Sequence, residues 1–220
     1  MIEDTARRVG ADLIAHGQHW HVFEERGRLI FQDETGLLDL PLPGLIGAHQ
    51  VQNAGIALAA LRQLGFDEAA CEAAVTQARW PARMQRLQTG PLVDAAAQAE
   101  LWLDGGHNPA AGEALAEALH RLPARPLHLV CGMLNTKDIA GYLRPLAAIA
   151  ESLHAVDIPG EPNTLPARDT AKVADGLGLH AVIAEDAETA IRQIVRDQPN
   201  ARILICGSLY LAGAVLRENG

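Results

Sequence analysis

The sequence contains few basic and few aromatic residues. Lys and Arg number 18 against 27 Asp and Glu, so the formal net charge is -9, and no Lys- or Arg-rich run occurs. Because binding to nucleic-acid phosphates needs a basic face, this composition argues against a nucleic-acid partner. Phe, Trp and Tyr make up only 4% of the 220 residues while 49% are hydrophobic, so we expect a core built mainly of Leu, Ala, Val and Ile.

Cysteine is also scarce. Cys71, Cys131 and Cys206 are widely spaced and odd in number, which fits neither a disulfide framework nor a metal site. Each has apolar neighbours, so we expect buried free thiols in a reducing cytoplasm. No apolar run approaches the roughly 20 residues that span a bilayer, and the first residues lack the basic flank and apolar stretch of a secretory signal. The sequence therefore predicts a cytoplasmic protein without a membrane partner.

Two nucleotide-binding motifs are missing. The Gly-x-x-x-x-Gly-Lys-Ser/Thr pattern of a P-loop occurs nowhere in the chain. A Rossmann-type dehydrogenase would need Gly-x-Gly-x-x-Gly after its first strand, and that motif is absent as well, so this class is the least favoured. No Ser or Cys nucleophile adjoins Asp104 and His107 in sequence, and hydrolytic catalysis is therefore unsupported.

Residues 1–78 are predicted to form a small first domain. Short apolar segments separated by Gly turns predict an antiparallel meander within residues 1–45. Helical spacing of apolar residues predicts a helix over 49–64, and Asp67 is positioned to cap a second helix that reaches about Gln77. Since proline disfavours the helical conformation of the residue before it, Trp80-Pro81 marks the domain boundary, and 79–220 form the second domain.

The second domain alternates between strand and helix patterns. Leu127–Cys131 and Arg202–Cys206 are apolar runs followed by Gly, which is typical of strands buried on both faces of a parallel sheet. The alternation predicts an α/β fold with a Rossmann-like, doubly wound, mostly parallel sheet. The expected strands are 84–88, 100–104, 127–131, 152–157, 180–184 and 202–206, and the expected helices are 109–121, 138–150, 169–177, 186–197 and 208–218.

The segment Asp104-Gly105-Gly106-His107-Asn108-Pro109 joins an expected strand to an expected helix. Its two glycines allow a ligand to approach the backbone closely. A carboxylate at the end of a strand in an open α/β sheet can accept hydrogen bonds from ribose hydroxyls. The alternative interpretation is that Asp104 and Asn108 only cap the helix, with Pro109 in its first turn.

Four further polar positions have both a functional and a structural interpretation. Asn53, near His49 and Gln50 at the start of an apolar helix, can read an adenine edge or orient a phosphate, or these side chains can cap the helix. Arg83 can place its guanidinium on a phosphate or remain a solvated linker residue. Lys137 and Ser208, each following an expected strand, can face a ligand at the sheet edge or belong to a helix start.

Four segments together carry a resemblance to a known family. They are Pro43-Gly44 with Gly47-Ala48-His49-Gln50-Val51-Gln52-Asn53-Ala54, Trp80-Pro81-Ala82-Arg83-Met84-Gln85, Leu103-Asp104-Gly105-Gly106-His107-Asn108-Pro109 and Gly207-Ser208-Leu209-Tyr210-Leu211-Ala212-Gly213. In order and approximate spacing they resemble folylpolyglutamate synthase/dihydrofolate synthase, of the ATP-dependent Mur ligase superfamily. The resemblance covers nearly all of the chain. It implies that 1–78 are the end of the central ATPase domain and that 79–220 are the C-terminal glutamate ligase domain.

The resemblance implies an ATP-dependent amide ligase. A carboxylate of dihydropteroate or of a reduced folate would be phosphorylated, and the amino group of L-glutamate would attack the acyl phosphate. By similarity Asn53, Arg83 and Asp104 would contact ATP, with Arg83 at the phosphates and Asp104 at the ribose. His107 and Ser208 would lie near the glutamate or the nucleotide, and Arg83 and His107 are the candidate catalytic residues. The implied cofactors are ATP and Mg²⁺.

The chain departs from the family pattern in two respects. Ala82 stands where the family usually has Gly, which is tolerable unless the backbone there needs a positive φ. The family's P-loop, magnesium ligands and most of its folate site belong to an N-terminal ATPase domain that is missing here, so we expect no metal ligand in this chain and no activity from it alone. The alternative function is a non-enzymatic adenine-nucleotide-binding or regulatory module.

Overall fold

The computed structural model describes residues 1–219. They form two compact units, Met1–Arg79 and the residues from Trp80 onward, which we call the N-terminal and the C-terminal unit. The division falls between Arg79 and Trp80, one residue after the end of the first domain placed at residue 78 from the sequence. Within residues 1–219, no helix combines the length and the apolar character needed to cross a membrane.

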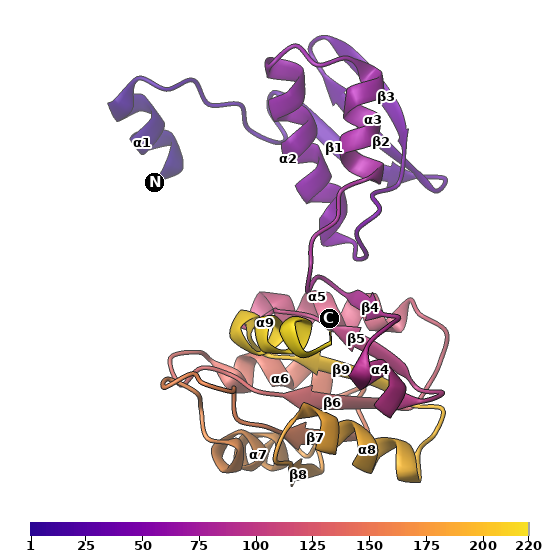
Figure 1. Cartoon of the computed structure of the whole chain (residues 1–220). Helices are drawn as coiled ribbons and strands as arrows, with labels where there is room; N and C mark the ends of the chain where they lie inside the picture. The colour runs from indigo at the N-terminus through magenta and orange to yellow at the C-terminus, as the bar shows by residue number, and fades with distance from the viewer. Residues whose placement is uncertain (220) are drawn as a thin grey trace. The chain divides into compact units, whose positions relative to one another are not determined.

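The N-terminal unit is an antiparallel meander covered by two helices (Figure 1). Its elements are β1 (Trp20–Glu25), β2 (Arg28–Asp33), β3 (Gly36–Pro41), α2 (His49–Gln63) and α3 (Glu68–Thr76). Asp67 caps α3 as predicted, because its carboxylate accepts a hydrogen bond from the Ala70 N–H at 2.8 Å. Gly55 lets α2 pack closely on β1, since a Cβ at this position would lie 2.6 Å from the Trp20 ring.

One helix of this unit was not predicted. Residues Ile2–Val9 form α1, whereas the sequence pattern suggested β-rich structure throughout residues 1–45. Its apolar residues Ile2, Ala6 and Val9 have helical spacing, but the segment is only eight residues long and none of its residues is buried. Acidic residues in its first turn and basic residues in its last turn match the helix dipole.

The C-terminal unit is built on a six-stranded sheet with the order β4-β5-β9-β6-β7-β8 (Figure 1). The strands are β4 (Gln85–Leu87), β5 (Glu100–Leu103), β6 (Leu127–Cys131), β7 (Ser152–Ala155), β8 (Ala181–Ile183) and β9 (Arg202–Cys206). Only β4 is antiparallel to its neighbour among the described strands of this sheet. The predicted α/β fold with a mostly parallel sheet is therefore confirmed.

Helices cover both faces of this sheet. They are α4 (Pro91–Ala96), α5 (Pro109–His120), α6 (Ile139–Ala147), α7 (Ala167–Gly176), α8 (Ala187–Asp197) and α9 (Leu209–Glu218). Leu129 packs into the core formed with α5, α6 and α7, and its neighbour Val130 packs into the core formed with α4, α8 and α9. Burial on both faces explains why the central strands are continuous apolar runs.

All predicted strands and helices of the C-terminal unit are present, with ends shifted by at most a few residues. The additional helix α4 is only six residues long, too short for a periodic pattern to identify. The three cysteines are free and buried, as expected. Cys131 and Cys206 are register partners on β6 and β9, and their mutual hydrogen bond and burial raise the pKa of Cys131 well above its usual value.

Buried histidines on β6 and β7 make the C-terminal unit sensitive to acid. Burial lowers the pKa of both His128 and His154 below 6.5, and the His128 Nδ1 lies 2.8 Å from the Ser152 Oγ. A histidine with a depressed folded-state pKa stays neutral in the native protein, while the unfolded chain takes up a proton below about pH 6.5. Its neutral form therefore supports stability above that pH and loses this effect as the pH falls.

We expect the free energy of unfolding of the C-terminal unit to decrease between pH 7.5 and pH 5.5, by up to about 1.4 kcal/mol per pH unit for each histidine. Hydrogen exchange of the β6 and β7 amides measures this change. In the variant that carries both His128→Asn and His154→Asn, the free energy of unfolding should depend less on pH than in the wild type. The control variant His120→Asn, at an exposed site, should have the same pH dependence as the wild type. Equal pH dependence in all three proteins would contradict the assignment.

Candidate functional site

The carboxyl ends of β5, β9 and β6 meet at one edge of the C-terminal sheet. Asp104 follows β5, and its N–H donates to the Ile205 carbonyl of β9 at 3.0 Å. Gly132 follows β6, and its N–H donates to the Cys206 carbonyl at 3.2 Å. The strand order therefore brings the turn after Asp104 beside the turn that contains Ser208. This is the edge at which open α/β sheets bind ligands.

Asp104 is 5% exposed and ties two loops together. Its Oδ2 accepts a hydrogen bond from the Met84 N–H at 2.8 Å, and its Oδ1 accepts one from the Gly106 N–H at 2.6 Å. The Gly105 N–H in turn donates to the Ala82 carbonyl at 2.9 Å. The carboxylate thus anchors residues 82–84 on the glycine turn, so the interpretation of Asp104 as a helix cap is wrong.

Asn108 has the capping role that the sequence left open. Its Oδ1 accepts a hydrogen bond from the Ala111 N–H at 2.9 Å, and Pro109 occupies the first turn of α5. A backbone in the extended region at Asn108 is typical of an N-cap residue. Asn108 therefore caps α5, whereas Asp104 at the other end of the same turn holds the loops together.

Arg83 lies over the glycine turn. Its Nη1 is 3.3 Å from the Ala82 carbonyl oxygen. A Cβ added to Gly105 would lie 3.5 Å from this nitrogen and 2.3 Å from the Leu209 Cδ2. The Leu209 side chain at the start of α9 therefore occupies the place of a Cβ at position 105, so only glycine fits there beside the Arg83 guanidinium.

The conformation around Arg83 is strained on both sides. Ala82 has φ 55° and Met84 has φ 40°, a region that L-residues other than Gly rarely adopt. Residues in such conformations concentrate at ligand-binding sites, where the surrounding contacts hold them. Sequence reasoning did not select Ala82 or Met84 as site residues. The available signal was Ala82 itself, because the family that this chain resembles usually has Gly there. That departure matters if the backbone needs a positive φ, and Ala82 has one.

His107 contacts the same turn from its other end. Its Nδ1 lies 3.0 Å from the Gly105 carbonyl oxygen. Because a carbonyl can only accept, this nitrogen carries the proton in the hydrogen-bonded form, and the Nε2 of the neutral ring is an acceptor. The ring is half-buried. The geometry gives His107 a fixed orientation with a basic nitrogen available for a ligand.

Ser208 caps α9, as one of its two interpretations predicted. Its Oγ accepts a hydrogen bond from the Tyr210 N–H at 3.0 Å, and the residue is 3% exposed. The preceding Gly207 has φ 105°, and a Cβ there would lie 2.8 Å from the Gly132 carbonyl oxygen. The hydroxyl hydrogen of Ser208 remains available to donate, so capping does not by itself remove a role toward a ligand.

Asn53 belongs to the N-terminal unit, on an exposed position of α2. Its Nδ2 donates to the Gln50 Oε1 at 3.0 Å, and the Gln50 Nε2 lies 2.9 Å from the His49 Nε2. The N-cap residue of α2 is Ala48, which provides no side-chain hydrogen bond. The interpretation of these polar side chains as helix caps is therefore wrong. They form a hydrogen-bonded row at a helix start whose backbone N–H groups lack a side-chain cap.

Lys137 is exposed in the loop between β6 and α6, and its N–H donates to the Leu134 carbonyl at 3.2 Å. Asp138, the next residue, caps α6 by accepting a hydrogen bond from the Gly141 N–H at 2.9 Å. Lys137 therefore lies at the start of a helix, as one of its two interpretations predicted.

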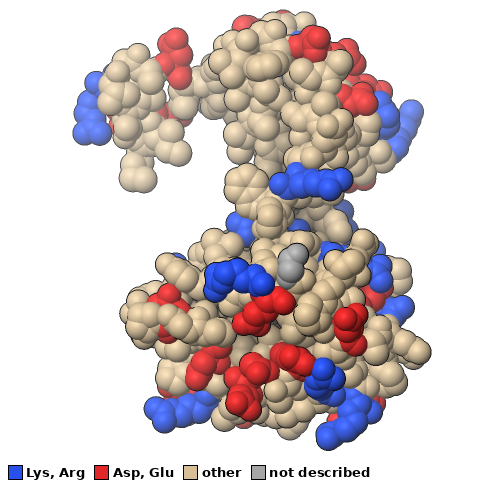
Figure 2. Space-filling model, viewed as in Figure 1, with Lys and Arg blue, Asp and Glu red and all other residues tan. Residues whose placement is uncertain are grey.

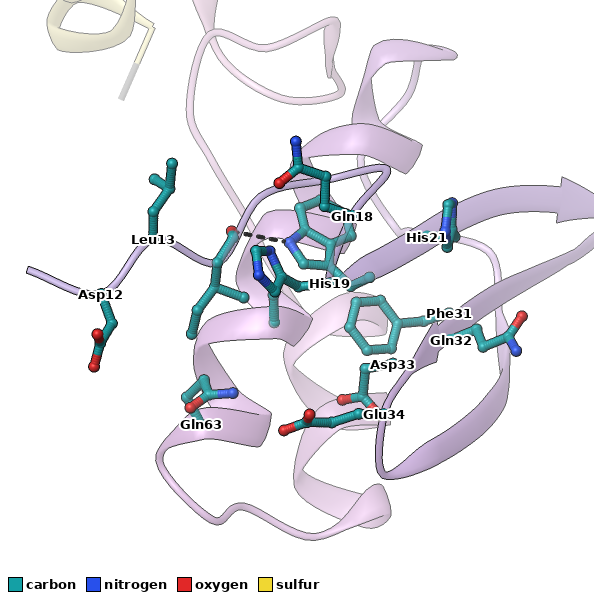
Figure 3. Close-up of a pocket in the computed structure, with 13 residues that line it drawn as sticks. Asp12, Leu13, Gln18, His19, His21, Phe31, Gln32, Asp33, Glu34 and Gln63 are labelled. Atoms are coloured by element: carbon teal, nitrogen blue, oxygen red, sulfur yellow. Dashed lines mark hydrogen bonds between the residues drawn. The ribbon is translucent and has the colours of Figure 1, made fainter. Parts of the chain in front are cut away.

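A hollow of about 610 Å³ lies on the N-terminal unit, and Figure 3 shows the residues that line it. The Trp20 Nε1 donates to the Ile14 carbonyl at 3.2 Å beside it. Among the described residues that line this hollow there are three carboxylates, Asp12, Asp33 and Glu34, and no Lys or Arg. Such a lining repels phosphate groups, so this hollow is a poor nucleotide site.

Charge and metal-binding groups are dispersed. Figure 2 shows acidic and basic side chains intermixed on the visible face of the C-terminal unit. Within the described part of the chain, no group of three or more His, Cys, Asp or Glu side chains is arranged to hold a metal ion.

Ala82→Gly provides a test of the strain beside Arg83. Glycine removes a buried methyl group but also relieves the left-handed conformation, so we expect unfolding free energy to change by less than about 0.5 kcal/mol or to rise. The matched control is Ala95→Gly in α4, at a similarly buried alanine with helical backbone, where a loss of about 1–2 kcal/mol is expected. Chemical denaturation measures both. Equal losses would show that position 82 is unstrained.

Comparisons with known proteins agree with this architecture. Residues 82–209 match the family model of the Mur ligase, glutamate ligase domain. A folylpolyglutamate synthase of Lacticaseibacillus casei is 26% identical over 98% of this chain and 51% of its own length. The structure of Escherichia coli FolC in complex with DHPP and ADP has a TM-score of 0.82 and 29% identity, covering 98% of this chain and 49% of that chain.

A third similar protein was solved with several ligands. It is a bifunctional folylpolyglutamate synthase/dihydrofolate synthase with Mn, AMPPNP and L-glutamate bound, with a TM-score of 0.81 and 27% identity over 98% of this chain and 50% of that chain. The chain spans about half the length of the curated relatives it matches over most of its own length. The similarity includes both units, because the aligned part extends beyond the residues matched by the family model.

Proposed function

The chain belongs to the Mur ligase family through its glutamate ligase domain, and from this premise we propose that it forms the C-terminal part of an ATP-dependent ligase. The proposed reaction joins L-glutamate to dihydropteroate or to a reduced folate through an acyl phosphate. In this proposal the N-terminal unit is the end of a central ATPase domain. The observation that carries the proposal is the arrangement of Arg83, Asp104 and His107 around Gly105, at the carboxyl edge of a parallel sheet.

The residues at this edge fit a nucleotide. Gly105 and Gly106 let the turn pack tightly, because a Cβ at these positions would lie 2.3 Å from the Leu209 Cδ2 or 2.9 Å from the Asp104 Oδ1. Asp104 uses both oxygens to hold the loops, and in the proposal its carboxylate contacts the ribose of ATP. Asn53 is likewise proposed to contact ATP through its side-chain amide.

Arg83 supplies the positive charge. During phosphoryl transfer negative charge spreads over the transferred group, and a guanidinium positioned beforehand stabilises it. The backbone of Arg83 is fixed by the hydrogen bonds from Met84 and Gly105 and by the strained conformations on both sides. Its side chain makes one long contact with a carbonyl. The guanidinium therefore starts from a fixed backbone and keeps its remaining hydrogen-bond donors for a phosphate.

His107 and Ser208 are proposed to face the incoming glutamate. The Nε2 of His107 can accept a hydrogen bond from the α-amino group, which holds that nitrogen toward the acyl carbon. The Ser208 hydroxyl can donate to a carboxylate while its oxygen continues to cap α9. Mg²⁺ would neutralise phosphate charge in such a reaction, but the described residues contain no cluster that fits it, so no step is assigned to the ion here.

The 220 residues alone are proposed to be inactive and to occupy the cytoplasm. No P-loop pattern occurs in the sequence, so the β- and γ-phosphates lack the backbone cradle on which this chemistry depends. The Mg²⁺ ligands and the P-loop would then come from an N-terminal ATPase domain.

The isolated chain should therefore release no ADP when given ATP, Mg²⁺, L-glutamate and dihydropteroate or tetrahydrofolate. We expect calorimetry to give a Kd for ATP on the order of 1 mM or weaker, because only part of the pocket is present. Measurable glutamate ligation would refute the incomplete-site proposal. Tight ATP binding without turnover would favour a nucleotide-binding regulatory module instead.

Arg83→Ala tests the catalytic assignment in a version of the protein that also contains the P-loop domain. We expect kcat to fall by about a hundredfold or more, since a charge on the transferring phosphoryl group is lost. The thermal unfolding midpoint should hardly change, because Arg83 makes only a 3.3 Å contact with its neighbour's carbonyl. The control is Arg168→Ala, at a side chain that is 79% exposed. Near wild-type turnover of the Arg83 variant would remove it from the mechanism.

A further inference from the structure

Three arginines surround one glutamate at the opposite edge of the C-terminal sheet, where β5 and β9 begin. The Arg202 Nε and Nη2 both lie 2.8 Å from the Glu100 Oε2. Arg86 and Arg125 lie farther away, at 3.6 Å and 3.5 Å from the Glu100 Oε1. Arg202 is thus the arginine that satisfies the carboxylate by hydrogen bonds, and the other two contribute charge without a close hydrogen bond to it.

The cluster carries an excess of positive charge. Burial alone raises the pKa of Glu100, but the hydrogen bonds from Arg202 and Trp102 and the charges of Arg202 and Arg125 lower it below its usual value, so Glu100 is ionised. Three guanidinium groups and one carboxylate give a formal charge of +2. The protein as a whole has a net charge of -9, so this concentration of arginine is a local exception.

A cavity of about 300 Å³ opens beside these arginines. Its polar wall includes Arg125 and Arg202, and Glu100 is not among its lining residues. The rest of the wall is mostly aliphatic, with side chains of Leu119, Leu122, Ala124, Leu127 and Ile149 together with His120. Small-molecule sites typically combine such an apolar wall with a few convergent polar groups, and volumes from roughly 300 Å³ are usual for them.

We propose that this cavity binds a small organic carboxylate with a short apolar body. Arg202 is 4% exposed and held by Glu100, so the floor of the cavity is rigid. The Arg125 side chain is 36% exposed and donates to the Asn200 carbonyl only at 3.3 Å, so its guanidinium can turn to a ligand. A planar guanidinium pairs well with a carboxylate, and the aliphatic wall accommodates the carbon chain.

The site is separate from the candidate ligase site. Arg202 and Leu127 are the first residues of β9 and β6, whereas Ser208 and Gly132 follow the carboxyl ends of the same strands. The inference therefore does not depend on the proposed function and is tested by binding alone.

The experiment titrates the full chain with hexanoate and follows backbone amide chemical shifts by NMR. We expect saturable shifts at Leu122, Leu127 and Ile149. Three control ligands each lack part of hexanoate. Hexanamide lacks the charge, acetate lacks the apolar body, and inorganic phosphate lacks both the carboxylate and the apolar body. Each should bind at least about tenfold more weakly than hexanoate, since charge-assisted hydrogen bonds and apolar contact both contribute.

Arg125→Gln should weaken hexanoate binding by about tenfold or more. The side chain is 36% exposed, so the substitution should leave the fold intact. The matched control is Arg121→Gln, at a 57% exposed arginine four residues earlier in the chain that pairs with Glu117, and it should bind like the wild type. The proposal is overturned if hexanoate causes no saturable shift, if Arg125→Gln binds it unchanged, or if phosphate or hexanamide binds equally well.

Discussion

The buried carboxylate of Asp104 is the interaction on which the candidate site depends. Removing a charged group from water is costly unless hydrogen bonds satisfy it, and Asp104 receives such bonds from Met84 and Gly106. The bond from Met84 joins segments that are 20 residues apart in sequence, while the bond from Gly106 lies within the turn itself. They hold the left-handed conformations beside Arg83, which the isolated segment would not retain. The position of the guanidinium is thus a consequence of how Asp104 is satisfied.

The elements of the sheet could be predicted from the sequence, but their order could not. Leu127–Cys131 and Arg202–Cys206 are strands at the predicted residues, because burial on both faces requires continuous apolar runs. The insertion of β9 between β5 and β6 is what places Ser208 beside Asp104. This order arises from packing among distant segments, and no local pattern encodes it. Helix α1 was missed for a different reason: it is only eight residues long, and none of its residues is buried.

The polar side chains at helix starts show where sequence reasoning left alternatives. Asn108 and Ser208 both have extended backbone immediately before a helix, and both cap it. Asp104 lies four positions farther from the helix than Asn108, outside the reach of a cap, and this spacing was a usable signal. The row from His49 to Asn53 begins inside α2, after its N-cap Ala48, so its side chains bond to one another. Whether such residues contact a ligand depends on the fold, which brings Arg83, Asp104, His107 and Ser208 to one edge.

The two edges of the C-terminal sheet use arginine differently. At the carboxyl edge Arg83 has no carboxylate within hydrogen-bonding distance among its described contacts, and its backbone rather than its side chain is fixed. At the amino edge Arg202 is fixed by Glu100, while Arg86 and Arg125 add charge beyond what one carboxylate neutralises. Neutralising Glu100 requires one guanidinium, so the need to bury this carboxylate explains Arg202 and leaves the other two unexplained. A carboxylate ligand in the cavity beside Arg125 and Arg202 would account for Arg125, because it would supply one negative charge there, whereas Arg86 does not line this cavity.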